Sequence, residues 1–481
     1  RNGTCELQRL AAEFGIREIP FKMDVPSIPM DTSTPSIVLN PEKCIKCGRC
    51  VKVCQEMQDV WALEFIGRGD GTRMAPAGDI ALNESPCIKC GQCSAHCPVG
   101  AIFEKDDTQK VWDAIRDPKK HTVVQIAPAV RVALGEAFGM PAGSLVTGKV
   151  YTALRRLGID VVFDTNWAAD LTIMEEGSEF VKRFKAGPSE LPLITTCCPS
   201  WVDFMEKNYS DMIPYFSTAK SPQMMMAAMT KTYYAEKVGI PREDIFHLSV
   251  MPCTSKKYEI TRDESMFSSG EQDIDASITT RELARMIKQA GIEFDELADQ
   301  EADQLLGTYS GAGTIFGASG GVMEAALRTA YNLVTGKDAE QVEFTPIRGL
   351  EGVKEAAIDI EGTEVRVAVA HSISNVKQVL DKVKAAKAAG EELPYHFIEV
   401  MACRGGCIGG GGQPYPATDD VRRARMEGLY SDDSMKADTL RCSHHNPQIK
   451  AVYDDFLGEP LGEKAHKFLH THYTPRPLYV K

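Results

Sequence analysis

CIKCGRCVKVC (44–54) and CIKCGQCSAHC (87–97) are two similar stretches, each with four cysteines separated by two, two and three residues. Three thiols spaced two residues apart can wrap one face of an iron–sulfur cubane, and in chains with two cubanes the fourth thiol reaches the other one. Such a repeat packs around inorganic clusters more than around apolar side chains. The two stretches therefore predict a small cysteine-rich unit over residues 39–105 that holds two 4Fe–4S clusters.

The spacing also assigns each thiol of the repeat to a cluster. We expect Cys44, Cys47, Cys50 and Cys97 to bind one cluster, and Cys87, Cys90, Cys93 and Cys54 to bind the other. Zinc is the alternative metal for soft thiolates, but the doubled spacing favours iron–sulfur clusters. Gln55 stands where a proline usually follows the first set, and this change removes no ligand. The unit is thus predicted to be an α+β ferredoxin-like domain, which alone would be an electron carrier.

The composition limits what the whole chain can be. Its 481 residues suggest two to four domains, and 43% hydrophobic with 25% charged residues is a globular composition. It contains no apolar run of about 18 residues, so we expect no membrane partner. The net charge of −13 argues against nucleic acid as a partner. Fifteen cysteines clustered at ligand spacing favour metal sites over disulfides.

Beyond the cysteine-rich unit the chain alternates strands and helices, which predicts parallel α/β layers. Strand-like runs occur at 121–127, 160–165, 192–196, 246–251, 364–370 and 395–401, and helical stretches include 167–184, 222–238, 279–290 and 320–335. We divide the chain into 1–38 (a short helix over 1–22 and a linker over 23–38), 39–105, 106–420 and 421–481. The last part is a charged, mostly helical tail. The chain begins at Arg1 and shows no signal-peptide pattern.

Three further segments hold five of the remaining seven cysteines: TTCCPSW (195–201), MPCTSKKYE (251–259) and EVMACRGGCIGGGGQP (399–414). Each follows a strand-like run, where loops of α/β sheets bind ligands. Four thiolates from three such loops could hold a third cubane, and the glycines would let the backbone approach a bulky group. Each cysteine alone could be a small core residue, but three such loops together weaken that interpretation.

These three segments, in this order, resemble the signature motifs of the iron-only hydrogenases, and the resemblance covers about residues 39–481. The first usually has Ser at Thr196 and often Gly at Ser200; both changes leave the cysteines in place. The resemblance implies a ferredoxin-like domain followed by a two-lobed α/β catalytic domain, wrapped by the helical segment 421–481. It also implies an active-site H-cluster, which is a 4Fe–4S cubane bridged to a diiron unit with carbonyl, cyanide and dithiolate ligands.

The resemblance implies a role for individual residues of the three segments. Cys198, Cys253, Cys403 and Cys407 would bind the cubane, and Cys407 would bridge to the diiron unit. Cys197 would pass a proton to the dithiolate amine, and Lys256 would donate to one cyanide. Met251 and Met401 would pack around the diiron unit, with Pro128 and Ala129 beside the other cyanide. Buried anionic ligands need donors such as Lys256, which agrees with these roles.

A proton path is implied by the resemblance but not by the residues alone. Glu176, Glu179 and Arg183 lie three and four apart, so a helix over 167–184 places them on one face. In similar hydrogenases the matching positions, with Ser217, lead protons to the thiol at Cys197. The alternative is a solvated face with a Glu179–Arg183 ion pair, which the residues alone favour because such pairs are common. The resemblance reverses this preference.

Two cysteines are left over. Cys5 resembles the tail of a site that binds a cluster through one histidine and three cysteines, and we expect no cluster at it because the preceding ligands are absent. The first 38 residues would then be a remnant of a longer cluster-binding region. Cys442 lies in RCSHHNP (441–447) beside His444 and His445. We do not expect a metal site there, because adjacent residues on a helix or strand do not face one point.

The predicted function is the reversible oxidation of dihydrogen, with electrons relayed to ferredoxin or to NADH-reacting partner subunits, after maturation proteins have installed the diiron unit. Alternatives within the same fold are a hydrogen sensor and a non-catalytic electron-transfer or cluster-scaffold protein. Lys43, Lys46, Arg49, Lys52 and Lys89 could dock an acidic ferredoxin or be ordinary solubilising charges. Periplasmic two-chain relatives carry the tail as a separate chain, so the fused tail favours a cytoplasmic location.

Overall fold

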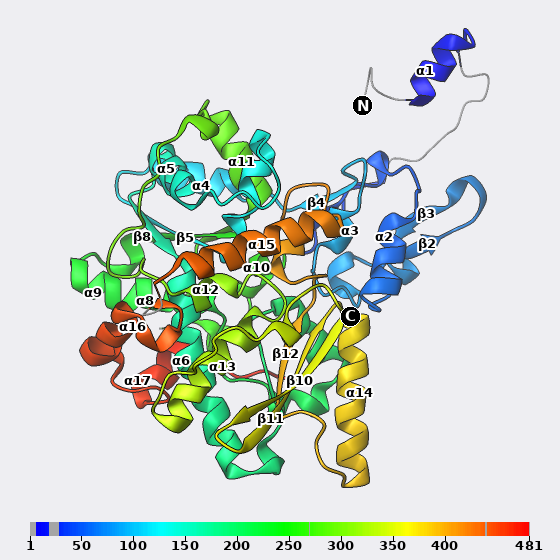
Figure 1. Cartoon of the computed structure of the whole chain (residues 1–481). Coiled ribbons are helices and arrows are strands. Elements are labelled where there is room, and N and C mark those ends of the chain that lie inside the picture. Colours follow the sequence, from blue (N-terminus) through cyan, green and yellow to red (C-terminus); the bar gives the residue numbers. More distant parts are fainter. Residues whose placement is uncertain (1–5, 19–27, 269, 438–439, 481) are drawn as a thin grey trace.

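The computed structural model describes residues 6–18, 28–268, 270–437 and 440–480 (Figure 1). The predicted first helix is present as α1 (Glu6–Glu13), and its apolar side chains Leu7 and Leu10 are exposed. Cys5, at which we expect no cluster, lies outside the described residues. Among the described residues, no helix combines the length and the apolar character that crossing a membrane requires.

The cysteine-rich unit is built as a repeat around two small antiparallel sheets. Its elements are β1 (Ile37–Leu39), α2 (Arg49–Lys52), β2 (Glu64–Ile66), β3 (Arg73–Ala75), α3 (Gln92–Ala95) and β4 (Ile102–Glu104). Strand β1 pairs with β4, and β2 pairs with β3. Gly48 and Gly91 precede α2 and α3 in the same left-handed conformation, which a residue with a Cβ adopts only with strain.

The linker expected over 23–38 is too long at its C-terminal end. Ile37 belongs to β1 and is buried, and Thr34 is also buried. Asp31 pairs with Leu39 through the backbone, and its carboxylate accepts a hydrogen bond from the Leu82 amide. The boundary at residue 39 therefore falls inside a strand, because this segment supplies the outer edge of the ferredoxin-like core.

The first catalytic lobe has a four-stranded parallel sheet in the order β6-β5-β8-β9. The strands are β5 (His121–Ile126), β6 (Val161–Asp164), β8 (Ile245–Met251) and β9 (Ala276–Thr279), and the helices of this lobe include α4 (Thr108–Arg116), α5 (Thr147–Leu157) and α11 (Thr280–Gln289). Three of the strands coincide with predicted runs, and β9 was not predicted. The parallel order brings the carboxyl ends of all four strands to one edge, where loops can build a site.

The second lobe has a mixed sheet in the order β10-β11-β12-β7. Its strands are β7 (Leu193–Ile194), β10 (Val353–Ile360), β11 (Thr363–His371) and β12 (Phe397–Met401), and it is flanked by α13 (Gly321–Thr335) and α14 (Ile373–Ala389). Strand β10 runs antiparallel to β11, which departs from the purely parallel expectation. The cause is the two-residue turn Glu361–Gly362, in which both residues have positive φ, as tight hairpins require.

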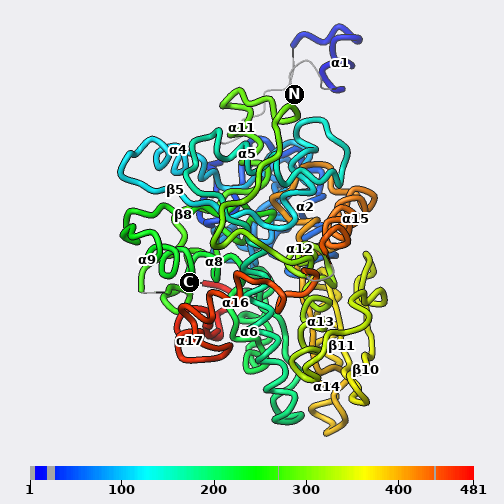
Figure 2. Tube along the Cα trace, turned by 60° about the vertical axis from the view of Figure 1, so that its left-hand side comes forward, coloured from blue at the N-terminus to red at the C-terminus, as the bar shows by residue number. Residues whose placement is uncertain are grey.

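Helices between the lobes and in the tail complete the fold. They are α6 (Thr165–Ala186), α7 (Pro199–Asn208), α8 (Pro222–Met229), α9 (Ala235–Val238), α10 (Lys256–Glu259), α12 (Gly311–Ile315), α15 (Asp419–Met435), α16 (Pro447–Val452) and α17 (Glu463–Leu469). Helix α6 contributes Trp167 to one hydrophobic core and Ile173 to the next. Helix α15 packs on α12, α16 on α6 and α17 on α8, so the tail wraps the catalytic lobes (Figure 2).

Candidate active site

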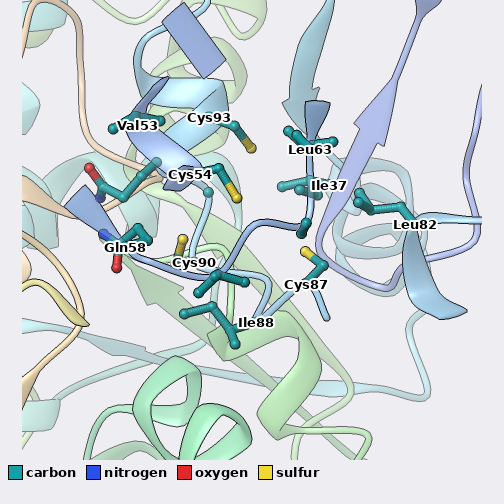
Figure 3. Close-up of a pocket in the computed structure, with 14 residues that line it drawn as sticks. Ile37, Val53, Cys54, Gln58, Leu63, Leu82, Cys87, Ile88, Cys90 and Cys93 are labelled. Atoms are coloured by element: carbon teal, nitrogen blue, oxygen red, sulfur yellow. The ribbon is translucent and has the colours of Figure 1, made fainter. Parts of the chain in front are cut away.

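The eight thiols of the ferredoxin-like unit surround two separate cavities. Cys54, Cys87, Cys90 and Cys93 line the first cavity, and their sulfur atoms point into it (Figure 3). Cys44, Cys47, Cys50 and Cys97 line the second. Each cavity thus takes three thiols from one half of the repeat and one from the other, which is the grouping expected from the sequence.

The two cavities differ in their exposure to solvent. Cys47 is exposed, and Ile45 beside it is 60% exposed. The corresponding Ile88 is 1% exposed. Burial, reinforced by the neighbouring thiols Cys93 and Cys87, raises the pKa of Cys90 well above its ordinary value. The loop 45–47 of the first half therefore faces the surface, and the corresponding loop 88–90 of the second half faces the interior.

The buried half is fixed against the catalytic loops by short contacts. The Thr254 hydroxyl donates to the Lys89 carbonyl at 2.9 Å, and the Gln92 amide donates to the Gly409 carbonyl at 3.0 Å. A Cβ on Gly91 would come within 2.3 Å of the Thr254 hydroxyl, and one on Gly411 within 2.5 Å of the Cys90 carbonyl. This close approach of two backbones brings Cys90 next to the glycine-rich segment.

Lys89 was grouped with the surface cations, and this interpretation is wrong. Its side chain is buried, and its ammonium contacts the Asp203 carboxylate at 2.9 Å. Asp203 also pairs with Lys207 at 3.0 Å and with Arg476 at 2.8 Å. Burial alone would raise the pKa of Asp203, but these cations lower it to about 2. Lys89 therefore stabilises the contact with the catalytic domain and is not available for docking.

A third group of thiols comes from the loops after β7, β8 and β12. Cys403 is buried and senses the charges of Cys253, Cys198 and Cys90, which together with burial raise its pKa well above the ordinary value. Burial and the charges of Cys253 and Cys198 likewise raise the pKa of Cys407. The loop can close around them because Gly406 has φ of 92°, and a Cβ there would lie 2.6 Å from the Ser319 amide.

Beside these thiols lies a cavity of about 60 Å³ between the lobes. Of the residues named from the sequence, Pro128, Cys197, Met251, Cys253, Lys256, Met401 and Cys407 line it. Ala129 follows Pro128 in the same tight turn but is not among the residues that line the cavity, and it lies so close to Gly317 that a Cβ on that glycine would be 3.3 Å from the Ala129 Cβ. The cavity wall is thus mostly apolar, with thiols and one ammonium group as its reactive groups.

Lys256 is held at the cavity by fixed partners. Its ammonium donates to the Cys197 carbonyl at 3.0 Å and to the Glu259 carboxylate at 2.8 Å. Burial would lower the pKa of Lys256, but the charge of Glu259 outweighs it and the pKa is raised. Lys256 therefore stays cationic in the buried cavity wall, where it can donate to an anionic ligand.

Comparison with known proteins identifies the family. Three protein families match the chain. The family described as "Iron only hydrogenase large subunit, C-terminal domain" matches residues 120–411, "Iron hydrogenase small subunit" matches 419–476, and "4Fe-4S dicluster domain" matches 43–101. The chain belongs to the iron-only hydrogenases. Its fold and its cofactors, 4Fe–4S clusters and the H-cluster, follow from this membership.

Individual relatives agree with the assignment. The chain is 48% identical to the NADP-reducing hydrogenase subunit HndD of Solidesulfovibrio fructosivorans, over 99% of this chain and 81% of that protein. It is 42% identical to iron hydrogenase 1 of Clostridium pasteurianum, over 98% and 82%. A solved variant of FeFe-hydrogenase HydA1 from Chlamydomonas reinhardtii is 42% identical, covers 77% of this chain and 99% of its own, and superposes with a TM-score of 0.67.

The residues of this hydrogenase fit the groups that the family carries. Two four-thiol cavities suit two 4Fe–4S clusters, which take thiolate ligands. Cys198, Cys253, Cys403 and Cys407 would bind the cubane of the H-cluster. They lie close enough together for the charges of the other three thiols to raise the pKa of Cys403. The adjacent apolar cavity, with Lys256 as donor, suits a diiron unit that bears cyanide.

A chain of polar groups leads from the cavity of the hydrogenase toward the surface. The charge of Glu176 helps to raise the pKa of the Cys197 thiol, and Glu176 hydrogen-bonds with Ser217. The Ser217 hydroxyl donates to Glu179 at 3.5 Å, and Arg183 donates to Glu179 at 2.5 Å. Burial raises the pKa of Glu176 to about 8. The Glu179–Arg183 ion pair of the alternative interpretation is thus present, but its carboxylate is buried and linked to the cavity.

Several residues at the site were missed from the sequence. Thr165, Ala169, Gln223 and Phe316 also line the cavity. Glu259, which holds Lys256, accepts a hydrogen bond from Gln223 at 2.8 Å. Thr165 is the last residue of the predicted strand-like run 160–165, and that position was the signal available for it. Gln223 and Phe316 carry no such signal, because only the packing of α8 and α12 brings them to the cavity.

Proposed function

We propose that this chain reversibly converts dihydrogen into protons and electrons, and that two 4Fe–4S clusters carry the electrons between the active site and a partner. The observation that carries the proposal is the buried polar chain that begins at Cys197 in the cavity wall and continues through Glu176. When bound, the H-cluster supplies the redox-active iron at which hydrogen is formed or cleaved. A protein that only carried electrons or sensed hydrogen would not need a complete proton path.

The proton route can be assigned residue by residue. The thiol of Cys197 would hold the proton nearest the reacting centre. Glu176, with its pKa raised to about 8 by burial, is protonated at neutral pH and can pass a proton to that thiol. Ser217 would bridge Glu176 and Glu179, and Arg183 would orient Glu179 near the surface. Each transfer then occurs between groups that are neighbours in the fold.

The electron route would run through the two four-thiol cavities. The charge of Cys90 helps to raise the pKa of Cys403, and the charge of Cys50 helps to raise the pKa of Cys93. The three groups of thiols are therefore neighbours in a series that runs from the active-site group through the buried cavity to the exposed one. The exposed end is the cavity lined by Cys47 and Cys97. Lys43, Lys46, Arg49 and Lys52 are exposed around it and would attract an acidic partner.

The partner would be a ferredoxin or an NADH-reacting subunit. Support for a subunit comes from the relative named as part of an NADP-reducing hydrogenase. Maturation proteins would be needed to install the diiron unit. The small-subunit region at 419–476 is fused to the catalytic region in this chain, which favours the cytoplasm as the location.

The test is hydrogen evolution from reduced methyl viologen after anaerobic maturation, with gas chromatography as the measurement. We expect the loaded protein to evolve hydrogen. Cys197→Ser should keep the iron content and lose activity by a factor on the order of 10²–10⁴, the size of a general acid–base contribution. Thr196→Ser, which restores the residue usual in the family, is the matched control and should keep activity. A fully loaded protein without activity would refute the proposal.

A further inference from the structure

The C-terminal segment brings three metal-ligating side chains together outside the active site. Cys442 precedes a tight turn over Ser443–His445, and the ligand atoms of Cys442, His444 and His445 lie within 4.8 Å of one another. The two imidazole rings are 4.3 Å apart between centroids. The expectation that adjacent residues would not face one point is wrong here, because the segment forms a tight turn and not a regular helix or strand.

A carboxylate from another element completes the group. Asp338, in the loop after α13, contacts His444 Nε2 at 2.9 Å and His445 Nε2 at 3.1 Å. The other ring nitrogen of His444, Nδ1, lies 3.1 Å from the Thr329 hydroxyl, which fixes the ring. These contacts leave His444 Nε2 directed toward the cluster.

One atom of the cluster has no partner among the described residues. His445 Nδ1 is buried and makes no hydrogen bond with any of them. An unsatisfied buried polar atom costs free energy, and native structures contain few of them. A cation bound by this lone pair would remove the cost. Asp338, which now contacts the opposite nitrogen Nε2, would leave that contact to reach the same cation.

We propose that Cys442, His444, His445 and Asp338 bind a structural zinc ion. Zinc prefers four ligands in a tetrahedron and accepts this mixture of thiolate, imidazole and carboxylate. Zn–S and Zn–N bonds of about 2.3 and 2.0 Å in a tetrahedron place the ligand atoms about 3.3–3.5 Å apart. The ligand atoms of Cys442, His444 and His445 now lie within 4.8 Å of one another, so these three side chains need shifts of about 1 Å. The half-exposed Asp338, which contacts both imidazoles from its loop, would turn toward them as the fourth ligand.

The ion would fasten the C-terminal segment to the catalytic domain. The Ser443 hydroxyl and the Asn446 amide both donate to Asp170 on α6, each at 2.8 Å. Thr329 and Asp338 belong to α13 and its following loop, and α13 packs on α6. Zinc at this point would join the tail to the helix pair that includes the α6 carboxylates of the proton route. Its role is positioning and stability, with no part in the reaction.

The experiment measures metal content in holoprotein prepared with its full iron complement and one added equivalent of zinc, then desalted. Plasma mass spectrometry should find about one zinc per chain, as a closed four-ligand site predicts. Cys442→Ser and His445→Gln should each lower zinc to below about a fifth of that while iron stays unchanged. His472→Gln, which changes an exposed histidine outside the cluster, is the matched control and should retain zinc.

Zinc X-ray absorption identifies the ligands and separates this site from a vacated iron–sulfur site. We expect one sulfur and three nitrogen or oxygen neighbours. An all-sulfur shell, zinc content unchanged in both variants, or wild-type protein that retains no zinc would each overturn the proposal. If Cys442→Ser fails to fold, His445→Gln with the same two measurements decides the question.

Discussion

The active-site cavity is reached by two routes that are built in different ways. The electron route consists of thiols, and their spacing in the sequence divides eight of them into two groups of four. The proton route consists of ordinary carboxylates and a hydroxyl, which differ from surface groups only because they are buried. The difference teaches that the ligands of the two ferredoxin-like clusters can be recognised from the spacing of cysteines in the sequence. A proton path depends on tertiary packing and cannot be recognised in this way.

Breaking the proton route at Glu176 should have the largest effect. Glu176→Gln keeps the shape but removes the titrating proton, so hydrogen evolution should fall by a factor on the order of 10²–10⁴. The iron content and the visible absorption of the clusters should not change. Glu190→Gln, at an exposed carboxylate just after the same helix, is the control and should leave the rate unchanged. Equal activity in both variants would contradict the route.

The two halves of the cysteine repeat differ in the burial of their ion pairs. Asp203→Asn would leave the buried Lys89 and Lys207 without their anion, so we expect the free energy of unfolding to fall by about 3–5 kcal/mol. Glu56→Gln removes the exposed partner of Lys52 in the first half and should change it by no more than about 0.5 kcal/mol. Anaerobic urea unfolding of the two holoproteins measures the difference. Similar midpoints would show that the halves are packed alike.

A second matched pair uses the same residue of each half. Ile88→Ala removes a side chain that is 1% exposed and should lower the free energy of unfolding by about 2–4 kcal/mol. Ile45→Ala removes one that is 60% exposed and should change it by about 0.5 kcal/mol at most. The same unfolding measurement applies. If Ile45→Ala proved the more costly, the first half would not face solvent.

The proton route should also show a pH dependence at Glu176. Burial raises its pKa from 4.5 to about 8, so the folded chain holds a proton that the unfolded chain loses between these values. Stability therefore falls as pH rises through this window, and Glu176→Gln should remove that part of the slope. Hydrogen evolution should likewise decline above about pH 8, by up to about tenfold per pH unit, as the proton donor is lost. A rate that is flat up to pH 10 would contradict this assignment.

The sequence predicted the two thiol groups of the ferredoxin-like unit from their spacing. The grouping of Cys54 with Cys87, Cys90 and Cys93 follows from spacing alone, because a cubane imposes its own geometry on nearby thiols. The strands that lead into the three catalytic loops were also predicted, since buried parallel strands read as continuous apolar runs. Strand β10 was missed, because its alternately exposed residues carry no such run.

What could not be predicted was which charges are buried. Lys46 and Lys89 occupy the same position in the two halves, yet one is exposed and the other is buried against Asp203. Glu179 and Arg183 form the common helical ion pair, and the contact with Ser217 joins that pair to the cavity. In each case the deciding contact comes from a segment far away in the sequence.

The most direct test of the central claim is isotope exchange, which needs no electron partner. Loaded protein is kept under deuterium gas in ordinary water, and the formation of HD is followed by mass spectrometry. If the cavity splits dihydrogen and passes protons through Cys197, the wild type should release HD, and Cys197→Ser with equal iron should release far less. A fully loaded wild type that forms no HD, or a variant that exchanges as fast as the wild type, would contradict the account.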